Sequence, residues 1–269
     1  MSNGSVVTLT TDFGSHDWFV GTMKGVILGI NPKASTVDIT HELPPGDVRA
    51  GGFALAASYS FFPTGTVHVT VVDPGVGSRR RAIAVQTSKY FFIGPDNGVL
   101  SWALRKEKVR AIHGLENEQY FPRSISRTFH GRDIFAPAAA HLSCGLAIRQ
   151  LGPRLKQVAT IEWPKPRRTR GYVDGEVVYV DRFGNAITNL ERADLGNAVK
   201  QRVSVSLGGR RLCSLGDYYE SVPKATPVAV IGSTGLLEIA INGGNAAGAL
   251  GLRVGDPVRL EPQANQSPR

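Results

Sequence analysis

The chain has 269 residues, enough for one large domain or two ordinary ones, and its 42% hydrophobic and 20% charged residues are typical of a globular protein. No apolar run is long enough to cross a membrane, so the sequence predicts no membrane-spanning helix and no membrane partner. The net charge of +9 is spread evenly, with 17 Lys and Arg against 12 Asp and Glu in residues 1–163 and 14 against 10 in the remainder, which favours a basic solvated surface over dedicated nucleic-acid binding.

Residues 6–162 alternate short strand-like runs with helical ones, which is typical of α/β folds. Strands are predicted at residues 6–10, 36–39, 67–72, 82–86, 91–95 and 109–112, and helices at residues 19–30, 48–60, 100–105 and 135–144. Asp47 is the predicted N-cap of the second helix. The first residues lack the basic start of a signal peptide, and Cys144 and Cys213 have no metal-binding spacing, so we expect a cytoplasmic protein with reduced, packed cysteines and no metal.

The pattern breaks at residues 163–168, where Pro164, Pro166 and a basic run predict a short, stiff linker. Beyond it, strands are predicted at residues 171–181, 186–189, 202–207, 210–214, 227–231, 237–241 and 257–261, with no helix of note. Several short strands without helices are typical of a small barrel or sandwich. We therefore expect an α/β domain over residues 1–163 and an all-β domain over residues 171–263, with a frayed polar tail at residues 262–269.

The segment from residue 71 to residue 81 carries the strongest chemical signal. A predicted strand ends in Asp73, a proline and two glycines then force a turn, and Arg80 follows seven residues after Asp73. A second segment, residues 128–137, contributes His130. A lone histidine is usually structural, but Gly131 removes bulk beside this one and a charged pair follows. An Asp, an Arg and a His at the carboxyl end of a strand can together orient and deprotonate a water.

Asp12 and Asp17 lie where the first predicted strand leads into the first helix. A carboxylate such as Asp12 can accept hydrogen bonds from both hydroxyls of a ribose, and an ionised Asp17 favours an ammonium group. For Asp17, capping of the following helix is an equally good interpretation. The glycines here lack the GxGxxG spacing, so a dinucleotide site is not predicted.

Two polar loops of the second half are further candidates. Phe183 can stack on a base, and Asn185 can both donate to and accept from an adenine edge. A hairpin with Gly184 and Asn185 at its turn is the simpler interpretation. The loop that begins at Ser233, with the segment that follows at residues 245–247, likewise has turn chemistry as its default explanation.

Six motifs, spread in order along essentially the whole chain, resemble one family. They read TDFG, VDPGVGS, PDNG, FHGRD, FGN and GLLEIA, and they start at residues 11, 72, 95, 129, 183 and 235. The family is the S-adenosyl-L-methionine (SAM) hydroxide adenosyltransferases, relatives of the fluorinase and chlorinase enzymes. Six motifs in the right order make this resemblance far more specific than a single glycine motif would.

The resemblance implies roles residue by residue. Asp73, Arg80 and His130 match the set that positions and activates a nucleophilic water, and Asp12 matches the carboxylate that binds the ribose hydroxyls. The remaining matches are substrate-binding positions: Asp17, Asp181 and Ser233 around the methionine amine and carboxylate, Phe129, Phe183, Asn185, Tyr218 and Ala246 on the side of the base, and Glu238 in the GLLEIA motif.

The resemblance also implies a Rossmann-like N-terminal α/β domain followed by a small all-β barrel, in a homotrimer. Each site would lie between the N-terminal domain of one subunit and the C-terminal domain of its neighbour. The implied reaction is hydrolysis of SAM to adenosine and L-methionine, with SAM as the substrate and no cofactor.

The chain departs from the halogenases in several places. Gly131 stands where they carry a halide-binding Ser, Asp73 and Val76 where they carry an aromatic residue and a Thr, and Thr234 where the fluorinase binds the methionine carboxylate through Arg. Three alternatives remain: a chlorinase-like halide adenosyltransferase, a hydrolase of another adenosine derivative, and a basic RNA-binding module.

Overall fold

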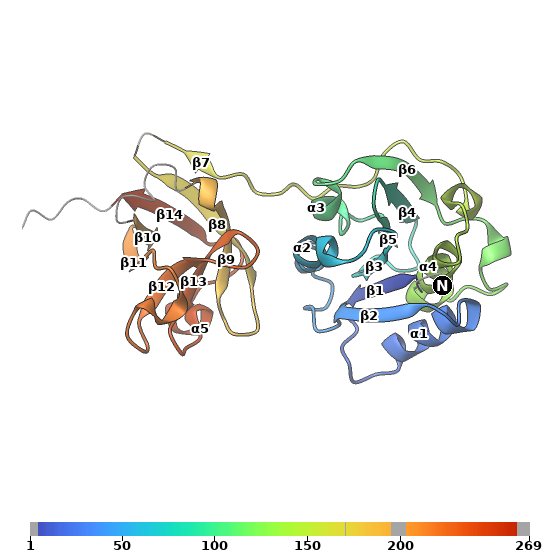
Figure 1. The fold of residues 1–269 in the computed structure, drawn as a ribbon, viewed down its shortest axis with the longest axis horizontal. Helices are drawn as coiled ribbons and strands as arrows, with labels where there is room; N and C mark the ends of the chain where they lie inside the picture. Colours follow the sequence, from blue (N-terminus) through green and yellow to red (C-terminus); the bar gives the residue numbers. More distant parts are fainter. Residues whose placement is uncertain (1–4, 170, 195–202, 263–269) are drawn as a thin grey trace, which may run out of the picture. The chain divides into compact units, whose positions relative to one another are not determined.

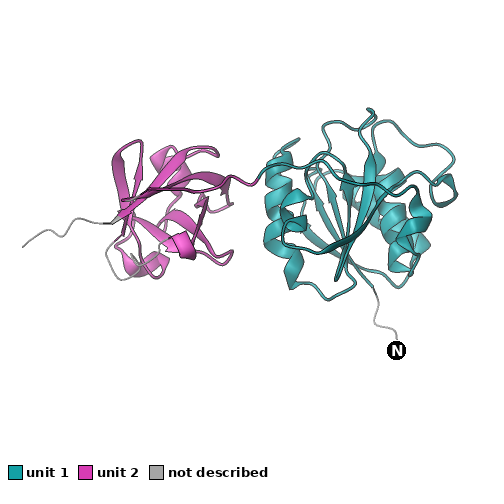
Figure 2. Ribbon diagram, turned by 90° about the horizontal axis from the view of Figure 1, so that it is seen from above, with its two compact units in different colours: residues 1–162 teal, residues 163–269 magenta. Residues whose placement is uncertain are grey.

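The computed structural model describes residues 5–169, 171–194 and 203–262. The chain divides after residue 162 into two compact units, which Figures 1 and 2 show. Residue 202, where a strand is predicted to begin, and residues 263–269 of the predicted tail lie outside the described residues. No helix of the described part is long and apolar enough to span a membrane.

The first unit is built on one six-stranded sheet in the order β2-β1-β3-β5-β4-β6. The strands are β1 (Val6–Thr11), β2 (Ser35–Thr40), β3 (Val67–Val71), β4 (Ala82–Thr87), β5 (Phe91–Pro95) and β6 (Val109–Gly114). The first, second, third and fifth strands are parallel, whereas β4 runs antiparallel to both of its neighbours. A three-residue connection joins β4 to β5, and so short a link can only join antiparallel strands. The predicted α/β class is confirmed, with a mixed sheet.

Helices lie on both sides of this sheet (Figure 1). They are α1 (Phe19–Ile30), α2 (Val48–Ser58), α3 (Ser101–Leu104) and α4 (Ala136–Ser143). Helices α1 and α4 share one core with the odd-numbered residues of β1 and β3. Met23 of α1, Leu9 of β1 and Val69 of β3 belong to this core. Because side chains alternate along a strand, His68 points to the other side, where it packs against Tyr59 after α2. The predicted N-cap Asp47 is confirmed, since its carboxylate accepts from the N–H of Ala50 at 2.9 Å.

Several boundaries differ from the predictions. The helix predicted at residues 135–144 begins one residue later and is preceded by a π-helical turn, Gly131–Phe135. A π-helical turn contains one residue more than an α-helical turn. Ile134 and Phe135 are buried in it as they would be in an α-helix, so the pattern of apolar residues does not reveal the extra residue. The helix predicted to residue 60 ends at residue 58. Short 3-10 turns also occur at Tyr59–Phe61, Glu118–Tyr120 and Ile148–Leu151.

The second unit is a nearly closed, antiparallel sheet. Its strands are β7 (Arg167–Arg168), β8 (Val173–Val180), β9 (Ala186–Glu191), β10 (Val203–Leu207), β11 (Arg210–Ser214), β12 (Pro227–Ile231), β13 (Leu236–Ile241) and β14 (Pro257–Pro262). The order is β11-β10-β14-β8-β9-β13-β12, and β7 pairs with β8. A bridge between Leu215 and Ala229 brings the two ends of this order together. The predicted all-β class is therefore confirmed as a barrel-like sheet.

Three details of this unit correct the sequence prediction. The segment predicted to be a linker contains β7, which pairs with β8. A short helix, α5 (Ala246–Leu250), occupies a segment interpreted as a polar loop, because Asn245 caps it by accepting from the N–H of Gly248 at 2.6 Å. Both cysteines are free, but only Cys213 is buried, so the expectation of packing is wrong for Cys144.

Candidate active site

A cavity of about 350 Å³ opens in the first unit where β1 and β3 end. These two strands are adjacent and parallel, so the residues that follow them meet at one edge of the sheet. The lining comes mainly from the turns after β1 and β3 and from the segment before the π-helical turn: Asp12, Phe13, Phe19, Gly46, Val71, Asp73, Pro74, Val76, Thr128, Phe129, His130 and Gly131. Four predicted site residues, Asp12, Asp73, Phe129 and His130, therefore share one pocket.

Arg80 joins Asp73 to His130. Its Nε lies 2.9 Å from each oxygen of the Asp73 carboxylate, and its Nη2 also donates to Oδ2. The same Nη2 lies 2.5 Å from Nδ1 of His130. Arginine only donates, so Nδ1 of His130 must accept, and the proton of the neutral imidazole sits on Nε2. The side chains of Asp73 and Arg80 are only 5% and 11% exposed, so this contact is largely shielded from solvent.

The surroundings keep His130 neutral. Burial, and then the positive charge of Arg80, lower the pKa of His130 below its usual value, while the charge of Asp73 acts in the opposite direction. The guanidinium of Arg80 also lies 5.4 Å from the centre of the Phe135 ring, which belongs to the π-helical turn. The π-helical turn therefore supplies an aromatic face near the arginine, and the residue just before it supplies the histidine.

Close backbone packing sets the shape of the turn after β3. Gly77 has a φ of +75°, and a Cβ there would lie 2.3 Å from the carbonyl oxygen of Arg127. This approach holds the turn against the segment that carries His130. The side-chain amide of Asn97 donates to the carbonyl of Val72 at 2.8 Å. The PDNG motif therefore fixes the backbone just after β3. Sequence reasoning assigned no role to this amide.

Replacing Gly77 by alanine should destabilise the protein by more than about 3 kcal/mol, because the positive φ adds strain of about 1–3 kcal/mol and the methyl group adds a clash with backbone. Gly65→Ala is the matched control, since Gly65 has a φ of +92° and no atom within 4 Å of its Cβ position. Urea unfolding of both variants separates strain from clash. Equal losses in the two variants would contradict the role given to the contact with Arg127.

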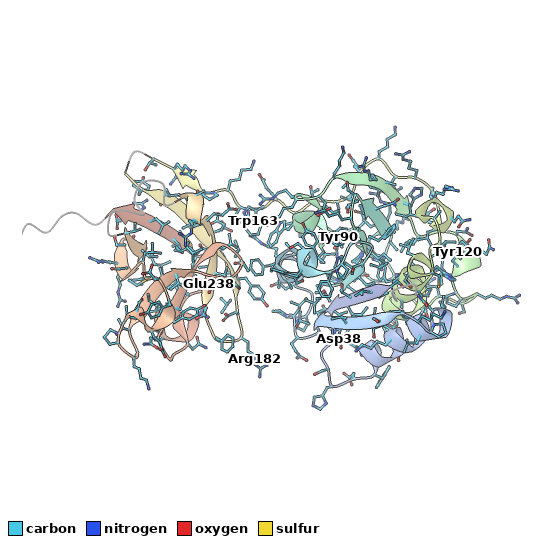
Figure 3. The ribbon with its side chains drawn as sticks, in the orientation of Figure 1. Asp38, Tyr90, Tyr120, Trp163, Arg182 and Glu238 are labelled. Atoms are coloured by element: carbon cyan, nitrogen blue, oxygen red, sulfur yellow. The ribbon has the colours of Figure 1, made fainter. Side chains whose placement is uncertain are left out.

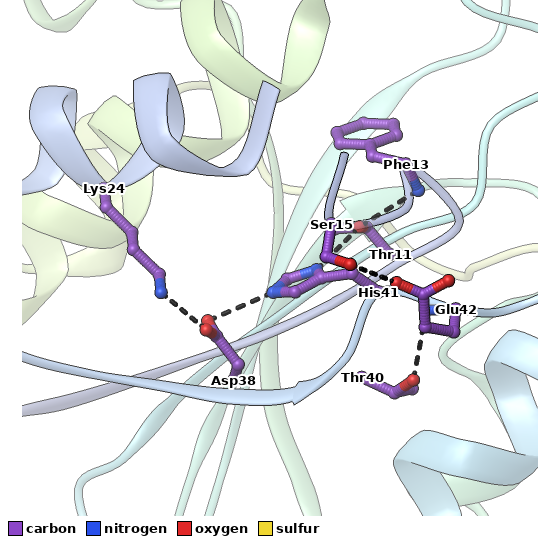
Figure 4. A network of polar contacts seen from close by, with 8 residues as sticks. All are labelled: Thr11, Phe13, Ser15, Lys24, Asp38, Thr40, His41 and Glu42. Carbon is purple, nitrogen blue, oxygen red and sulfur yellow. Dashed lines mark hydrogen bonds and ion pairs between the residues drawn. The ribbon is translucent and has the colours of Figure 1, made fainter. Parts of the chain in front are cut away.

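A polar network fixes the turn after β1 (Figure 4). The Phe13 N–H donates to Thr11 Oγ1 at 3.2 Å, and that hydroxyl lies 2.8 Å from Nδ1 of His41. Nε2 of His41 lies 3.1 Å from Asp38, whose carboxylate also binds Lys24 at 2.5 Å. These contacts tie the end of β1 to β2 and, through Lys24, to α1.

The result of this network is the position of Asp12. Its neighbour Gly14 donates its N–H to the His41 carbonyl at 2.7 Å, and the Asp12 carboxylate accepts from the N–H of Gly46 at 2.7 Å. This hydrogen bond orients the Asp12 carboxylate at the pocket that the residue lines. Sequence reasoning treated His41 as an ordinary histidine, and nothing in its flanking residues marks it.

Asp17 does not join this group. It is exposed and does not line the pocket. Its alternative interpretation as a helix cap is wrong, because α1 begins after Trp18 and has no side-chain cap. Its assignment to the substrate amine stays a prediction.

In the second unit, Asp181 organises the hairpin between β8 and β9. Oδ1 of Asp181 accepts from the backbone N–H of Phe183 at 2.9 Å and of Asn185 at 2.8 Å, and Oδ2 accepts from the Asn185 amide at 3.0 Å. The loop is thus a hairpin turn, as the simpler interpretation has it. This bonding leaves the Phe183 ring 76% exposed.

The remaining predicted residues of this unit fall into two groups. Tyr218 and Ser233 are exposed, whereas Ala246 and Glu238 are buried. Figure 3 labels Glu238, which accepts from the Tyr219 hydroxyl at 2.8 Å. Burial raises the pKa of Glu238, and burial with this hydrogen bond raises the pKa of Tyr219 to about 12. Glu238 therefore holds the 3-10 turn Tyr219–Ser221 in place through the Tyr219 hydroxyl. Tyr219 is a residue that sequence reasoning missed.

Charged groups at the carboxyl ends of parallel strands, in a pocket with aromatic walls, define an enzyme-type site of the α/β class. Comparison with known families narrows this class. Residues 7–152 match the SAM hydroxide adenosyltransferase N-terminal domain, and residues 175–259 match its C-terminal domain. The chain belongs to the SAM hydroxide adenosyltransferase family.

Individual relatives agree with this assignment. The chain is 42% identical to the (R)-S-adenosyl-L-methionine hydrolase of Thermus thermophilus, over 94% of this chain and 98% of that one. The fluorinase of an Actinoplanes species is 26% identical, over 94% and 97%. A crystal structure of an uncharacterized conserved protein from Thermotoga maritima superimposes with a TM-score of 0.90 at 37% identity, covering 94% of this chain and 99% of that one.

Proposed function

We propose that this protein hydrolyses SAM to adenosine and L-methionine. The single observation that carries the proposal is the contact of Asp73, Arg80 and His130 at the pocket. Greater identity to a SAM hydrolase than to a fluorinase supports water, and not halide, as the nucleophile.

The chemistry asks little of the protein beyond positioning. Water attacks the ribose 5′ carbon, a C–O bond forms, and the C–S bond breaks with its electron pair going to sulfur. Sulfur leaves as a neutral thioether, so no acid is needed. Asp73 accepts the proton of the water, and Arg80, which does not itself line the pocket, orients the Asp73 carboxylate and the His130 ring through its N–H groups. Hydroxide and sulfonium neutralise each other, so a site shielded from solvent lowers the barrier.

The substrate-binding residues divide between the two units. Asp12 holds the ribose hydroxyls with its carboxylate, and Phe129 lies along the adenosine. The second unit supplies the remaining contacts to the base and the amino acid, through Asp181, Phe183, Asn185, Tyr218, Ser233, Glu238 and Ala246. Asp17 completes the set beside the methionine amine.

The resemblance extends this proposal to the assembly. The first unit is Rossmann-like, the second is a small barrel, and three chains form a cyclic trimer. In that trimer the water-activating set comes from one chain and the base-side wall from its neighbour, and the protein acts in the cytoplasm.

The space around Gly131 supports water over halide. A Cβ at this position would lie 3.0 Å from Met23 Sδ, 3.1 Å from the Phe129 ring and 3.2 Å from the Phe13 ring. These separations are tighter than most side-chain contacts, so the serine of the halogenases would displace its neighbours. No feature of the described residues favours an RNA-binding module or a hydrolase of another nucleoside.

Product analysis tests the proposal. The protein is incubated with SAM, with and without chloride or fluoride, and the nucleosides are separated by chromatography. We expect adenosine and methionine under all conditions, at a rate that Asp73→Asn lowers strongly. A halogenated nucleoside would indicate the chlorinase-like reaction, free adenine would indicate a nucleoside hydrolase, and no turnover would reject the proposal.

The pH profile should report on His130. Its lowered pKa keeps the ring neutral at pH 7, and protonation removes the lone pair that accepts from Arg80. We therefore expect kcat/KM to fall on the acid side, below the ordinary value of about 6.5, as the pH passes through the folded-state pKa. His130→Gln should lose about 10- to 100-fold at pH 7.5 and show no such limb.

Protonation of His130 also disfavours folding, since a depressed histidine pKa makes stability fall as the pH falls. The melting temperature is therefore measured in the same buffers. An acid limb that persists in His130→Gln would remove this residue from the profile.

A further inference from the structure

A second cavity of the first unit lies away from the active site. Its volume is about 510 Å³, and its walls come from β4, β5, β6 and the segment around the 3-10 turn Ile148–Leu151. Figure 1 shows β4 and β6 at one side of the sheet, and β6 contacts this 3-10 turn. We call it the arginine pocket after three of its lining residues, Arg110, Arg149 and Arg154.

The two cavities sit at opposite edges of the parallel strands. Phe91 of the arginine pocket pairs with Val67, the first residue of β3, whereas Asp73 follows the last residue of that strand. Because β3 and β5 run in the same direction, Phe91 lies at the start of these strands and Asp73 lies beyond their end. The two cavities are therefore separated by the length of the strands. The arginine pocket is therefore not an extension of the SAM site.

The charge of the arginine pocket is not compensated. Its lining includes three arginines and His113 but no aspartate or glutamate. Within residues 5–169, 171–194 and 203–262, no hydrogen bond or ion pair is present for the side chains of Arg110, Arg149 and Arg154. Other arginines of the chain do have such partners, as Arg81 has Asp96 and Arg132 has Asp133. Three guanidinium groups gathered on one cavity attract a polyanion.

The floor of the same cavity is apolar. Leu142 and Ile148 belong to the main core of the unit, and Phe91, Ala111 and Leu146 pack against that core from its partly exposed edge. Phe91 is a half-buried aromatic residue of this lining, and aromatic side chains are the usual stacking partners of planar bases. His113 is held by a 2.8 Å contact between its Nδ1 and the Gly152 carbonyl, which fixes the ring as part of the wall. A charged rim above an apolar floor suits a ligand with both kinds of surface.

We propose that the arginine pocket binds a nucleoside di- or triphosphate. The arginines take the phosphate oxygens, for which the planar guanidinium is well matched, and the floor takes the nucleoside. The cavity volume falls within the range of about 300–1,000 Å³ that is usual for small-molecule sites. The proposal concerns a site outside the SAM pocket and does not depend on the hydrolase reaction.

Calorimetric titration tests this site on the full chain. ATP, inorganic tripolyphosphate and a short single-stranded RNA are titrated into protein that is saturated with adenosine, which blocks the SAM pocket. We expect one ATP per chain, bound at least tenfold more tightly than tripolyphosphate. Arg110→Gln, Arg149→Gln and Arg154→Gln combined in one variant should weaken ATP binding about tenfold or more per arginine.

A matched triple variant controls for net charge. Arg123→Gln, Arg210→Gln and Arg253→Gln remove the same charge from exposed positions outside both cavities, and ATP affinity should be unchanged. Equal weakening by both triple variants would overturn the proposal by reducing it to general electrostatics. Equal affinity for tripolyphosphate and ATP, or tighter binding of the RNA, would overturn the nucleoside assignment. Adenosine production from SAM is measured separately, so failure of either proposal is recognised by itself.

Discussion

The Asp73→Asn variant should lose about 10²–10⁴-fold in kcat while retaining its fold. The amide still fills the space beside Arg80, but it cannot take a proton from water, and the negative charge facing the guanidinium is gone. Adenosine affinity should change little, because adenosine lacks the reacting sulfonium and is held by Asp12 in our proposal. Initial rates with saturating SAM and the dissociation constant of adenosine give the two quantities.

Asp96→Asn is the control for this experiment. Asp96 is also a shielded aspartate, with its side chain 3% exposed, and it pairs with Arg81, the next residue after Arg80. It does not line the pocket. We expect a loss of stability with kcat within about threefold of the wild type, since the change disturbs the pair with Arg81 and the hydrogen bond from the Ala159 N–H, both outside the pocket. If both variants lose activity to the same extent, Asp73 acts only by holding the segment of Arg80 and Arg81 in shape, and its role as the proton acceptor is rejected.

The water-activating set could be predicted because its signals are local. Asp73 and Arg80 share a turn whose proline and glycines are visible in the sequence, and a strand end places such a turn at the sheet edge. His130 lies 50 residues beyond Arg80, and its glycine and charged neighbours, together with the resemblance, suggested that it joins them; the structure brings Nδ1 of this ring to 2.5 Å from the arginine. The catalytic role of the three stays a prediction.

The supporting residues could not be predicted, because their signals are spatial. His41 matters through its contacts with Thr11 and Asp38, which come from different strands. The π-helical turn inserts a residue without changing which side chains are apolar, so periodicity misplaces the start of α4. Tyr219 becomes significant only through the buried Glu238. For His41 and Tyr219 the deciding contact joins residues 30 and 19 positions apart, whereas the π-helical turn is local but carries the apolar pattern of an ordinary helix.

The first sheet contains both parallel and antiparallel strands, and the sequence explains why. Alternating strands and helices predict parallel pairing, and four of the six strands obey it. Between β3 and β5, however, no helix intervenes, and β4 turns back through a three-residue link. Closer attention to that missing helix would have predicted the antiparallel strand.

Two impaired variants of this protein should restore activity to each other when they assemble together. Asp73→Asn removes the water-activating carboxylate from the first unit. Phe183→Ala removes an exposed ring from the second unit and should lower kcat/KM about 10- to 100-fold through lost stacking on the base. Phe183 is a better choice than Asn185, whose amide and N–H hold the hairpin through Asp181.

If each site takes its first unit from one chain and its second unit from the neighbour, random mixing in a trimer leaves about a quarter of the sites with two intact halves. Co-expression with two affinity tags and tandem purification isolates the mixed assemblies, each of which holds one intact site in three, so their rate should approach about a third of the wild-type rate. The control pairs Asp73→Asn with His130→Ala, because both changes lie in the first unit and no mixed assembly can hold an intact set. Recovery in the control as well would point to contamination by wild-type protein.

Mixed assemblies without recovery, or an active monomer in sedimentation, would show that one chain builds the whole site. The shared-site proposal would then be abandoned, while the proposed chemistry at Asp73 would stand.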